Sequence, residues 1–313
     1  MNGEQLAWMI RRTTAELTHD SQSGHIGSVY SMADLLGVLY AEILRYRADD
    51  PKWKQRDRFV LSKGHAVAGL LAALAETGFF PKEKLAAYCR DGSELIGHAS
   101  YLVPGVELST GSLGHGVSMA AGMALAAKKS HQNYKVYVLA GDGECNEGSV
   151  WEAAMFASQF QLDNLVMIID YNHLQSLDST ANTMGLDPLE EKFRDFGWHT
   201  AAIDGHDLSA IRQAYAGLKE GQPNVIIAHT VKGKGVPFME NDVLWHYRFP
   251  HDGWEYDQVV CALHQHMPAG IADPYTPKGI ANPALPSEND LDKRHAMSDT
   301  YHPTFYALGG RKA

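Results

Sequence analysis

Two short motifs contain side chains that could bind a metal ion and a diphosphate. The first is Gly141-Asp142-Gly143-Glu144, and the second is Tyr171-Asn172-His173-Leu174. A carboxylate oxygen and an amide oxygen suit Mg²⁺, whose remaining ligands are commonly phosphate oxygens and water. The glycines beside Asp142 would let a diphosphate approach the backbone closely. The residue types therefore predict a site where a divalent cation and a diphosphate bind together.

The elements around these motifs would bring them to the same place. Residues 136–140 and 165–169 are short apolar runs typical of buried strands, and residues 147–161 between them have a helical apolar stripe. In such a strand–helix–strand unit both strand ends open at one edge of a parallel sheet, where ligands bind. The Asp142 carboxylate and the Asn172 amide should then lie side by side. An ordinary strand–turn–helix connection without a ligand is the alternative.

Alternation of strands and helices along the chain predicts an α/β fold, a doubly wound parallel sheet with helices on both faces. Ser31 and Asp34 are spaced as a capping box, and Asp207 suits a helix N-cap. Residues 91–113 are rich in glycine and are expected to form a loop. Further strands are expected at 58–61, 200–203 and 224–228, and helices at 4–19, 31–44, 66–78, 114–129, 188–197 and 207–220, with another beginning at Pro81.

The composition restricts the class of protein. The chain has 313 residues, of which 45% are apolar and 20% charged, so it can bury a large core. A formal net charge of −10 argues against nucleic acid and anionic membranes as partners. The three cysteines show no metal or redox spacing, and Cys145 is expected to be a small buried residue. Without a signal-like segment, a cytoplasmic location is expected.

The chain divides near residue 250. Residues 1–250 contain the alternating strands and helices and are expected to form the diphosphate- and metal-binding domain. Residues 251–313 are expected to be a C-terminal extension, and prolines are frequent in it from Met267 onward. We expect this extension to be partly extended or wrapped on a partner.

Taken in order, the motifs resemble the N-terminal, thiamine-diphosphate-binding part of transketolases, over about residues 5–250. Two positions depart from the pattern: Ile26 stands where the family usually has proline, and His173 where the thiamine-diphosphate signature usually has a second asparagine. The resemblance depends on the motifs jointly. They are Ser23-Gly24-His25-Ile26-Gly27, Leu61-Ser62-Lys63-Gly64-His65-Ala66, Gly97-His98, Thr110-Gly111-Ser112-Leu113-Gly114-His115-Gly116, Gly141-Asp142-Gly143-Glu144 with Glu147-Gly148, and Trp245-His246.

The resemblance implies roles for individual residues. Side chains of Asp142 and Asn172, and the backbone carbonyl of Leu174, would bind Mg²⁺, Ca²⁺ or Mn²⁺. Gly143 would contact the diphosphate of thiamine diphosphate, and Glu147 resembles an acidic residue at the family's subunit interface. The complete set implied for cofactor binding is His65, Gly111, Ser112, Leu113, Gly143, Glu147, Asn172 and His246.

Four histidines are implied in catalysis. The reaction breaks a C–C bond beside a ketose carbonyl, and the cofactor accepts the electrons. Proton transfer near neutral pH is typical work for imidazoles, which can also bind sugar hydroxyls. A single Gly-His pair is more often an ordinary turn, but four at family positions favour a catalytic role. They are His25 and His98, facing the donor hydroxyls, and His65 and His246, near the diphosphate or the reacting carbons.

For His115, Lys232 and Lys234 the sequence leaves two interpretations open. His115 could act in catalysis like the other histidines, or it could simply cap the helix that begins at Gly114, near the cofactor. Lys232 and Lys234 could meet a substrate phosphate, or they could belong to a mobile surface loop. The small-residue helix at 114–129 and Trp151 fit a subunit interface.

The family's second and third domains have no counterpart after residue 250. In the family they supply the glutamate that contacts the cofactor's pyrimidine ring and most contacts to the acceptor phosphate. We therefore expect one subunit of a split transketolase, which moves a two-carbon ketol unit from a ketose phosphate to an aldose or aldose phosphate. A second polypeptide would carry the pyrimidine-binding and C-terminal domains, with two copies of each chain. Donor and acceptor, including branched or sulfonated sugars, stay open.

Two alternatives remain at this point. One is another thiamine-dependent chain, similar to a deoxyxylulose-phosphate synthase or to the α subunit of a 2-oxo acid dehydrogenase. The other is a non-catalytic assembly module of the same fold. The histidine motifs at positions 25 and 65, with Trp245-His246, favour transketolase over the first alternative. Against the second stands the retention of the site residues Asp142, Asn172, His25, His65, His98 and His246.

Overall fold

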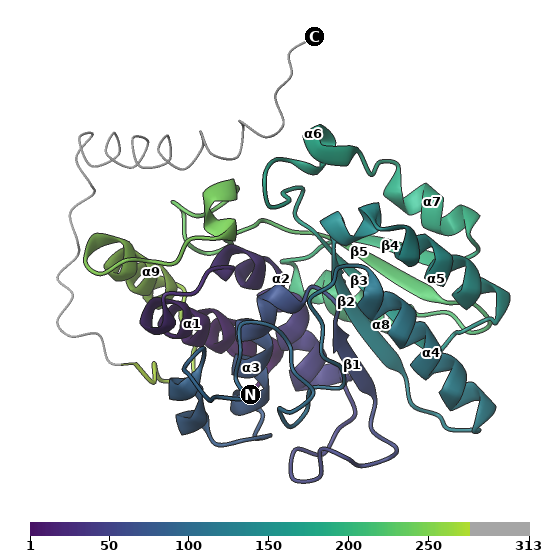
Figure 1. Cartoon of the computed structure of the whole chain (residues 1–313), viewed down its shortest axis with the longest axis horizontal. Coiled ribbons are helices and arrows are strands. Elements are labelled where there is room, and N and C mark those ends of the chain that lie inside the picture. Colours follow the sequence, from purple (N-terminus) through teal and green to yellow (C-terminus); the bar gives the residue numbers. More distant parts are fainter. Residues whose placement is uncertain (276–313) are drawn as a thin grey trace.

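A five-stranded parallel sheet forms the centre of the structure, a computed structural model that describes residues 1–275 (Figure 1). The strand order is β1-β2-β3-β5-β4, and every neighbouring pair is parallel. All of β3 and all but the last residue of β2 are buried, as expected for central strands covered on both faces. The predicted doubly wound parallel sheet is confirmed. The strands are β1 (Arg58–Leu61), β2 (Val136–Gly141), β3 (Leu165–Tyr171), β4 (His199–Asp204) and β5 (Asn224–His229).

Alternate residues of the strands enter two separate cores, one on each face of the sheet. Tyr137 and Leu139 pack with α1 (Gly3–Ser21), α2 (Ile26–Val38), α3 (Val67–Glu76) and α8 (Leu208–Ala216). Val136 and Val138 face the opposite core, which contains α4 (His115–Lys129), α5 (Gly148–Gln159) and α7 (Leu189–Asp195). Because alternate side chains pack into opposite cores, the position and register of each strand are fixed. The positions of the residues that follow each strand are fixed as a consequence.

The helix predicted at 31–44 begins earlier than its sequence pattern indicated. His25 adopts a left-handed conformation with φ 74°, and α2 begins at Ile26. Ser31 therefore lies within the helix, and its hydroxyl donates to Asp170 at 2.5 Å, so the predicted capping box with Asp34 is wrong. Beyond Val38 the helix continues as a π-helical turn, Leu39–Ile43.

The first residues of helices α1 and α8 are set by capping side chains in the local sequence. Asn2 and Gln5 form a capping box at the start of α1, and the Asp207 carboxylate accepts two backbone amides at the start of α8, as predicted. The segment after Pro81 is a 3₁₀ helix, Lys82–Ala87, and not an α-helix. Sequence reasoning missed the short helix α6 (Thr180–Met184).

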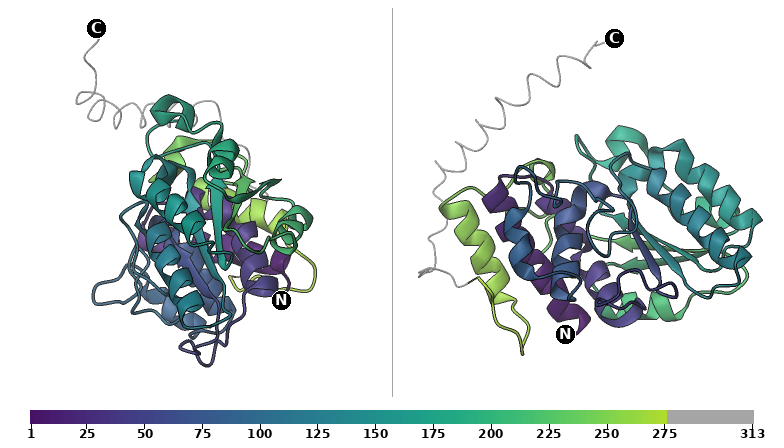
Figure 2. Two further views of the ribbon diagram at one scale, coloured as in Figure 1. Left: turned by 90° about the vertical axis from the view of Figure 1, so that its right-hand side faces the viewer. Right: turned by 60° about the horizontal axis from the view of Figure 1, so that its bottom comes forward.

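The predicted extension begins with another helix that was missed, α9 (Trp254–Gln265). Figure 2 shows α9 beside α1, on the side away from the sheet. The Trp8 indole N–H donates to the Leu263 carbonyl at 2.7 Å, and Arg12 pairs with Asp273 at 3.1 Å. The extension as far as residue 275 thus packs on α1 of its own chain, and the rest of it lies outside the described residues.

Among the residues that the structure describes, one helical segment, Ile26–Ile43, is long and apolar enough to cross a membrane. It is 83% buried within the fold, which is what a core helix of this composition would show.

Candidate active site

The segments that follow β1, β2, β3 and β5 gather at the carboxyl edge of the sheet (Figure 1). They are Gly64–Ala66, Asp142–Asn146, residues 172–174 and residues 230–235. This edge is where ligands bind in parallel α/β sheets. Almost every residue predicted to bind the metal or the cofactor, or to take part in catalysis, lies on these segments or on loops that reach them.

The two motifs predicted to meet do so at Asp142. One oxygen of this buried carboxylate accepts the His173 amide at 2.7 Å, and the other accepts the Gly143 amide at 2.8 Å. The Asn172 side-chain oxygen accepts the Leu174 amide at 3.1 Å. His173, the departure from the family pattern, has φ 63° and directs its ring toward Tyr171, with 4.1 Å between the ring centroids.

The electrostatics of Asp142 fit a bound cation. Burial, with the negative charge of Asp170, raises the pKa of Asp142 to about 7. A divalent ion would offset both effects, and the oxygens of Asp142, Asn172 and the Leu174 carbonyl are of the hard class that Mg²⁺ takes. In the described part of the chain, no three His, Cys, Asp or Glu side chains gather as a metal site. The predicted ligand set contains only one such side chain, so it does not depend on a cluster of that kind.

Glu144 connects three segments beneath this site. Its buried carboxylate accepts the Gly141 amide at 2.9 Å, the Gly114 amide at 2.8 Å and the Ser62 hydroxyl at 2.6 Å. The acidic residue of the first motif therefore fixes the backbone around Asp142, and sequence reasoning had not assigned it a role.

We expect Glu144→Gln to lower the free energy of unfolding by about 2–3 kcal/mol, because the amide replaces a charged acceptor and turns a donor toward backbone donors. Urea denaturation of the variant and of Glu152→Gln, at an exposed position on α5, measures the difference. A loss below about 0.5 kcal/mol in Glu144→Gln would contradict the structural role.

The predicted cofactor loop lies beside Glu144. Gly111 and Ser112 are exposed and Leu113 is half-buried. Gly114 has φ 81°, and a Cβ there would lie 2.7 Å from the Cβ of exposed Glu147. The loop therefore presents its backbone to solvent at the carboxyl edge, with Glu147 next to it.

Four predicted histidines, from four separate segments, form one cluster. The ring centroid of His25 lies 5.1 Å from that of His65, 5.2 Å from His246 and 6.3 Å from His98. The rings of His65 and His246 are 5.4 Å apart. The His25 amide donates to the His246 carbonyl at 2.9 Å, which fixes the two segments together.

Three imidazoles of the cluster, those of His25, His65 and His246, are held neutral. Burial, together with the nearby rings and lysines, lowers the pKa of His25 to about 4 and that of His246 to about 2. The pKa of His65 falls well below its ordinary value for the same main reason, burial. Neutral rings at pH 7 can accept a proton or donate a hydrogen bond, as general acid–base chemistry requires.

These pKa shifts predict how stability depends on pH. A histidine whose pKa is depressed in the folded state is protonated first in the unfolded state. Its contribution to stability is therefore lost as pH falls from about 6.5 toward about 4. For the metal-free chain we expect a slope of up to roughly 1.4 kcal/mol per pH unit for each such histidine. The slope should be smaller in His25→Gln.

Denaturation at several pH values measures this slope. At pH 8 the rings of His25, His65 and His246 are neutral in both states, so the variant should differ from the wild type there only by a constant offset. An equal slope in both proteins between pH 6.5 and 4 would contradict the assignment.

A buried ion pair lies directly behind the histidines. The Lys63 ammonium donates to Asp170 and, at 2.9 Å, to the Ser28 carbonyl. The Ser31 and Thr230 hydroxyls also donate to Asp170, and despite its burial these partners hold the pKa of Asp170 below its usual range. Sequence reasoning missed this network, although a charged residue at the end of an apolar strand was a signal.

Lys232 belongs to the site and not to a mobile surface loop. It is 1% exposed, and its ammonium lies 2.7 Å from His246 Nδ1 and 3.1 Å from the Leu174 carbonyl. Burial, and then the charge of Lys63, lowers the pKa of Lys232 to about 8. The surface-loop interpretation is therefore wrong for Lys232. Lys234 is partly exposed and lies 3.8 Å from Glu240.

Three further residues are placed by the structure. His115 is the first residue of α4 and exposed, while Gly114 occupies the N-cap, so His115 does not cap this helix. Trp151 is half-buried and packs on Phe193 and Phe196 of its own chain, with centroid distances of 5.1 and 5.7 Å. Its place at a subunit interface stays a prediction. Cys145 is buried, as predicted.

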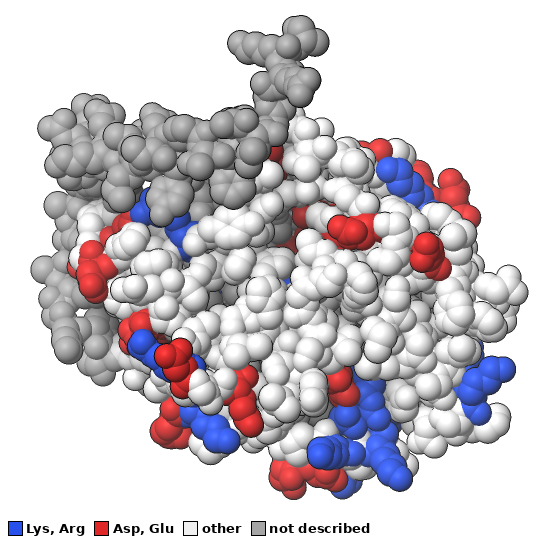
Figure 3. Space-filling model, in the orientation of Figure 1, with Lys and Arg blue, Asp and Glu red and all other residues white. Residues whose placement is uncertain are grey.

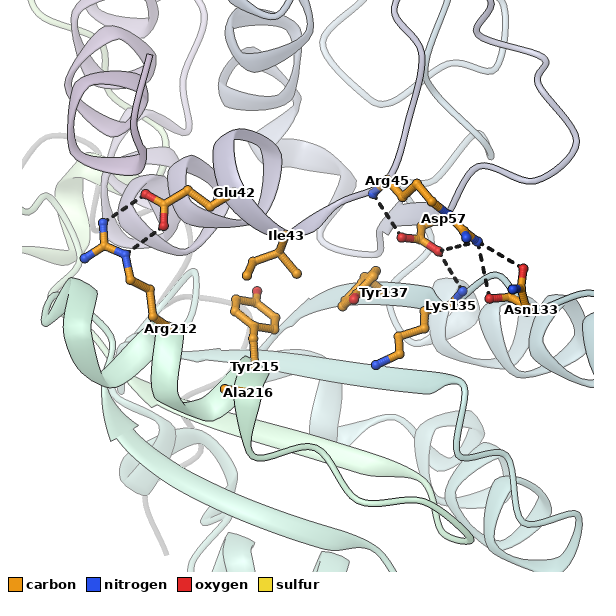
Figure 4. Close-up of a pocket in the computed structure, with 10 residues that line it drawn as sticks. All are labelled: Glu42, Ile43, Arg45, Asp57, Asn133, Lys135, Tyr137, Arg212, Tyr215 and Ala216. Carbon is orange, nitrogen blue, oxygen red and sulfur yellow. Dashed lines mark hydrogen bonds and ion pairs between the residues drawn. The ribbon is translucent and has the colours of Figure 1, made fainter.

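A separate cavity of about 410 Å³ lies at the opposite edge, where β1 and β2 begin (Figure 4). Arg212 pairs with Glu42 at 2.7 Å, and Arg45 lies 3.6 Å from Asp57. Two of its three cations thus have acidic partners within the cavity wall, and no predicted site residue lines it.

Residues 3–247 match the family described as transketolase, thiamine diphosphate binding domain. The chain belongs to the transketolase family. The resemblance predicted for residues 5–250 is confirmed over nearly the same range.

Relatives within the transketolase family include proteins named as separate subunits. An apulose-4-phosphate transketolase subunit from Phocaeicola vulgatus is 41% identical over 252 residues, which are 80% of this chain and 89% of that one. A 6-deoxy-6-sulfo-D-fructose transketolase subunit from Clostridium sp. is 42% identical over 241 residues, 76% of this chain and 88% of that one.

A solved transketolase from Campylobacter jejuni superposes with a TM-score of 0.81 at 30% identity, covering 88% of this chain. Only 44% of that transketolase is covered, so the chain spans less than half of its length.

Proposed function

We propose that this chain is the N-terminal, thiamine-diphosphate-binding subunit of a two-subunit transketolase. It would transfer a two-carbon ketol unit from a ketose phosphate to an aldose or aldose phosphate. The observation that carries the proposal is the meeting of the four-histidine cluster and the Asp142–Asn172 pair at one sheet edge. The relatives named as transketolase subunits favour this function over the synthase, dehydrogenase and non-catalytic alternatives.

The residues divide between the two ends of the site. Asp142, Asn172 and the Leu174 carbonyl would hold Mg²⁺, and the backbone of Gly143 and of residues 111–113 would hold the diphosphate. Thiamine diphosphate, when bound, supplies the electron sink for breaking the C–C bond. Glu147 is exposed beside this loop. It would lie at the subunit interface, facing the partner chain that forms the other side of the cofactor site.

The histidines would handle protons and hydroxyls. The Lys232 ammonium can only donate, so His246 Nδ1 accepts from it and His246 Nε2 carries the ring proton. His246 would therefore present an N–H donor to an oxygen of the substrate or the diphosphate. His25 and His98 would bind donor hydroxyls, and His65, with its ring kept neutral, could accept a hydroxyl proton.

A second chain would complete the site. It would carry the pyrimidine-binding and C-terminal domains, and two copies of each chain would assemble, in the cytoplasm. Figure 3 shows a broad uncharged area in the middle of one face, with charged groups toward its margins. Large apolar side chains on and next to the outer surfaces of α4 and α5 could meet a partner; they are Met119, Met155, Phe156 and Phe160.

Calorimetric titration of thiamine diphosphate with Mg²⁺ tests the proposal. The chain is titrated alone and after mixing with a candidate second subunit. We expect tight binding only in the mixture. No heat of binding in either sample would overturn the proposed function while leaving the family and the fold unaffected.

A further inference from the structure

The turn after β4 packs against the loop that carries Lys232. The Gly205 amide donates to the His229 carbonyl at 2.8 Å, and a Cβ on Gly205 would lie 2.4 Å from the Thr230 methyl carbon. Next to it, the Val231 amide donates to His206 Nε2 at 2.9 Å. Only one peptide unit separates this contact from Lys232.

The partners of His206 determine where its ring proton lies. A backbone amide can only donate, so Nε2 must be an unprotonated acceptor. Nδ1 then carries the proton and donates to Asp34 at 2.7 Å. Asp34 lies on α2, and Arg11 on α1 donates to both of its oxygens, at 2.9 and 2.5 Å. Burial opposes ionisation, yet Arg11 and His206 hold the pKa of Asp34 well below its usual range.

We propose that His206 is a positioning residue for the active site: its imidazole, oriented by Asp34, holds the Val231 amide and so fixes Lys232 against His246 and the Leu174 carbonyl. The importance of Lys232 for catalysis rests on the function proposed above. The path runs from Arg11 and Asp34 in the helical layer, through His206, to the cofactor edge of the sheet.

The geometry of the loop explains why the hydrogen bond between the Val231 amide and His206 matters. Residues 230–235 form neither helix nor strand, so isolated backbone hydrogen bonds hold them in place of a regular ladder. The amides of Thr230, Gly233 and Asn241 donate to the carbonyls of Tyr171, Gly27 and Lys232, respectively. Lys232 Nζ must stay within hydrogen-bond distance of three acceptors on two segments: it lies 2.7 Å from His246 Nδ1, 3.1 Å from the Leu174 carbonyl and 3.4 Å from the Gln175 carbonyl. A shift of the Val231 backbone would lengthen these contacts and free His246 Nδ1 from the Lys232 ammonium, which sets the His246 tautomer.

Two substitutions separate the two hydrogen bonds of His206. Asparagine places an amide N–H where Nδ1 stands, so His206→Asn keeps the bond to Asp34 and loses the acceptor for Val231. Glutamine reaches further, so His206→Gln can return an acceptor to the Val231 amide while giving up the bond to Asp34. His199→Asn, at the other end of β4, is the matched control.

Two readouts are measured on the full-length chain. The first is hydrogen exchange at the Val231 amide without cofactor. The second is the affinity for thiamine diphosphate with Mg²⁺ in the mixture with the second subunit. In His206→Asn we expect exchange to be faster, and affinity weaker, by about tenfold, as for loss of one buried hydrogen bond. His206→Gln and His199→Asn should stay within about threefold of the wild type in both.

Wild-type exchange and affinity in His206→Asn would overturn the inference. Equal losses of affinity in both His206 variants, with Val231 still protected, would also overturn it, because the effect would then come from general stability. If the unmodified protein binds no thiamine diphosphate, the proposed function fails, and the exchange comparison still decides whether His206 holds the loop.

Discussion

Replacement of Asp142 by alanine is expected to abolish magnesium-dependent binding of thiamine diphosphate. Asp142 is the only carboxylate in the proposed ligand set, and Asn172 and the Leu174 carbonyl are neutral donors. Loss of residues that merely support metal ligands typically costs 10–100-fold in affinity, so removal of the charged ligand should cost at least about 100-fold. Titration of the cofactor at several Mg²⁺ concentrations, in the mixture with the second subunit, measures this loss.

The control for Asp142→Ala is Asp195→Ala, at an exposed position on α7. It should leave cofactor affinity unchanged. Circular dichroism must show that Asp142→Ala keeps its fold, because Asp142 also accepts the His173 and Gly143 amides. A folded Asp142→Ala protein with wild-type affinity would show that the metal is held elsewhere.

The largest effect on stability is expected for Lys63→Met. Lys63 is 2% exposed and Asp170 is fully buried, so the substitution leaves a carboxylate in the core without its cation. Breaking a buried pair by removing one partner typically costs about 3–5 kcal/mol. Urea denaturation should show a loss of this size at pH 7.

Two further variants test whether the loss of stability in Lys63→Met comes from the unpaired Asp170 carboxylate. The double variant Lys63→Met/Asp170→Asn should recover part of the stability, because the unpaired charge is gone. Lys128→Met breaks a surface pair with Asp163, separated by 3.0 Å, and should cost less than about 1 kcal/mol. A loss in Lys63→Met no larger than that in Lys128→Met would contradict the role of the buried pair.

Much of the central sheet could be predicted from local patterns. The apolar runs at 136–140 and 165–169 became β2 and β3, because a strand buried on both faces must be apolar throughout. Their pairing brought Asp142 to the backbone after Asn172, as parallel topology requires. The histidine cluster was predicted from the resemblance and not from any pattern within the sequence.

Interactions between distant segments explain the predictions that were wrong. Ser31 looked like a helix cap, but its hydroxyl serves Asp170, 139 positions away. Lys232 looked like a loop lysine, and its burial depends on Leu174 and His246, which only the fold brings near. The helix α9 has Glu255 and Asp257 in its first turn, a helix-start signal that sequence reasoning overlooked, and it packs on α1 through the contact between Trp8 and Leu263.

The most direct test of the account is a ketol-transfer assay on the purified chain, alone and mixed with its candidate second subunit. The assay contains thiamine diphosphate and Mg²⁺, and a panel of ketose phosphates serves as donors. We expect transfer of a two-carbon unit by the mixture and none by either chain alone. Full activity of this chain alone, or no activity of a mixture that binds the cofactor, would contradict it.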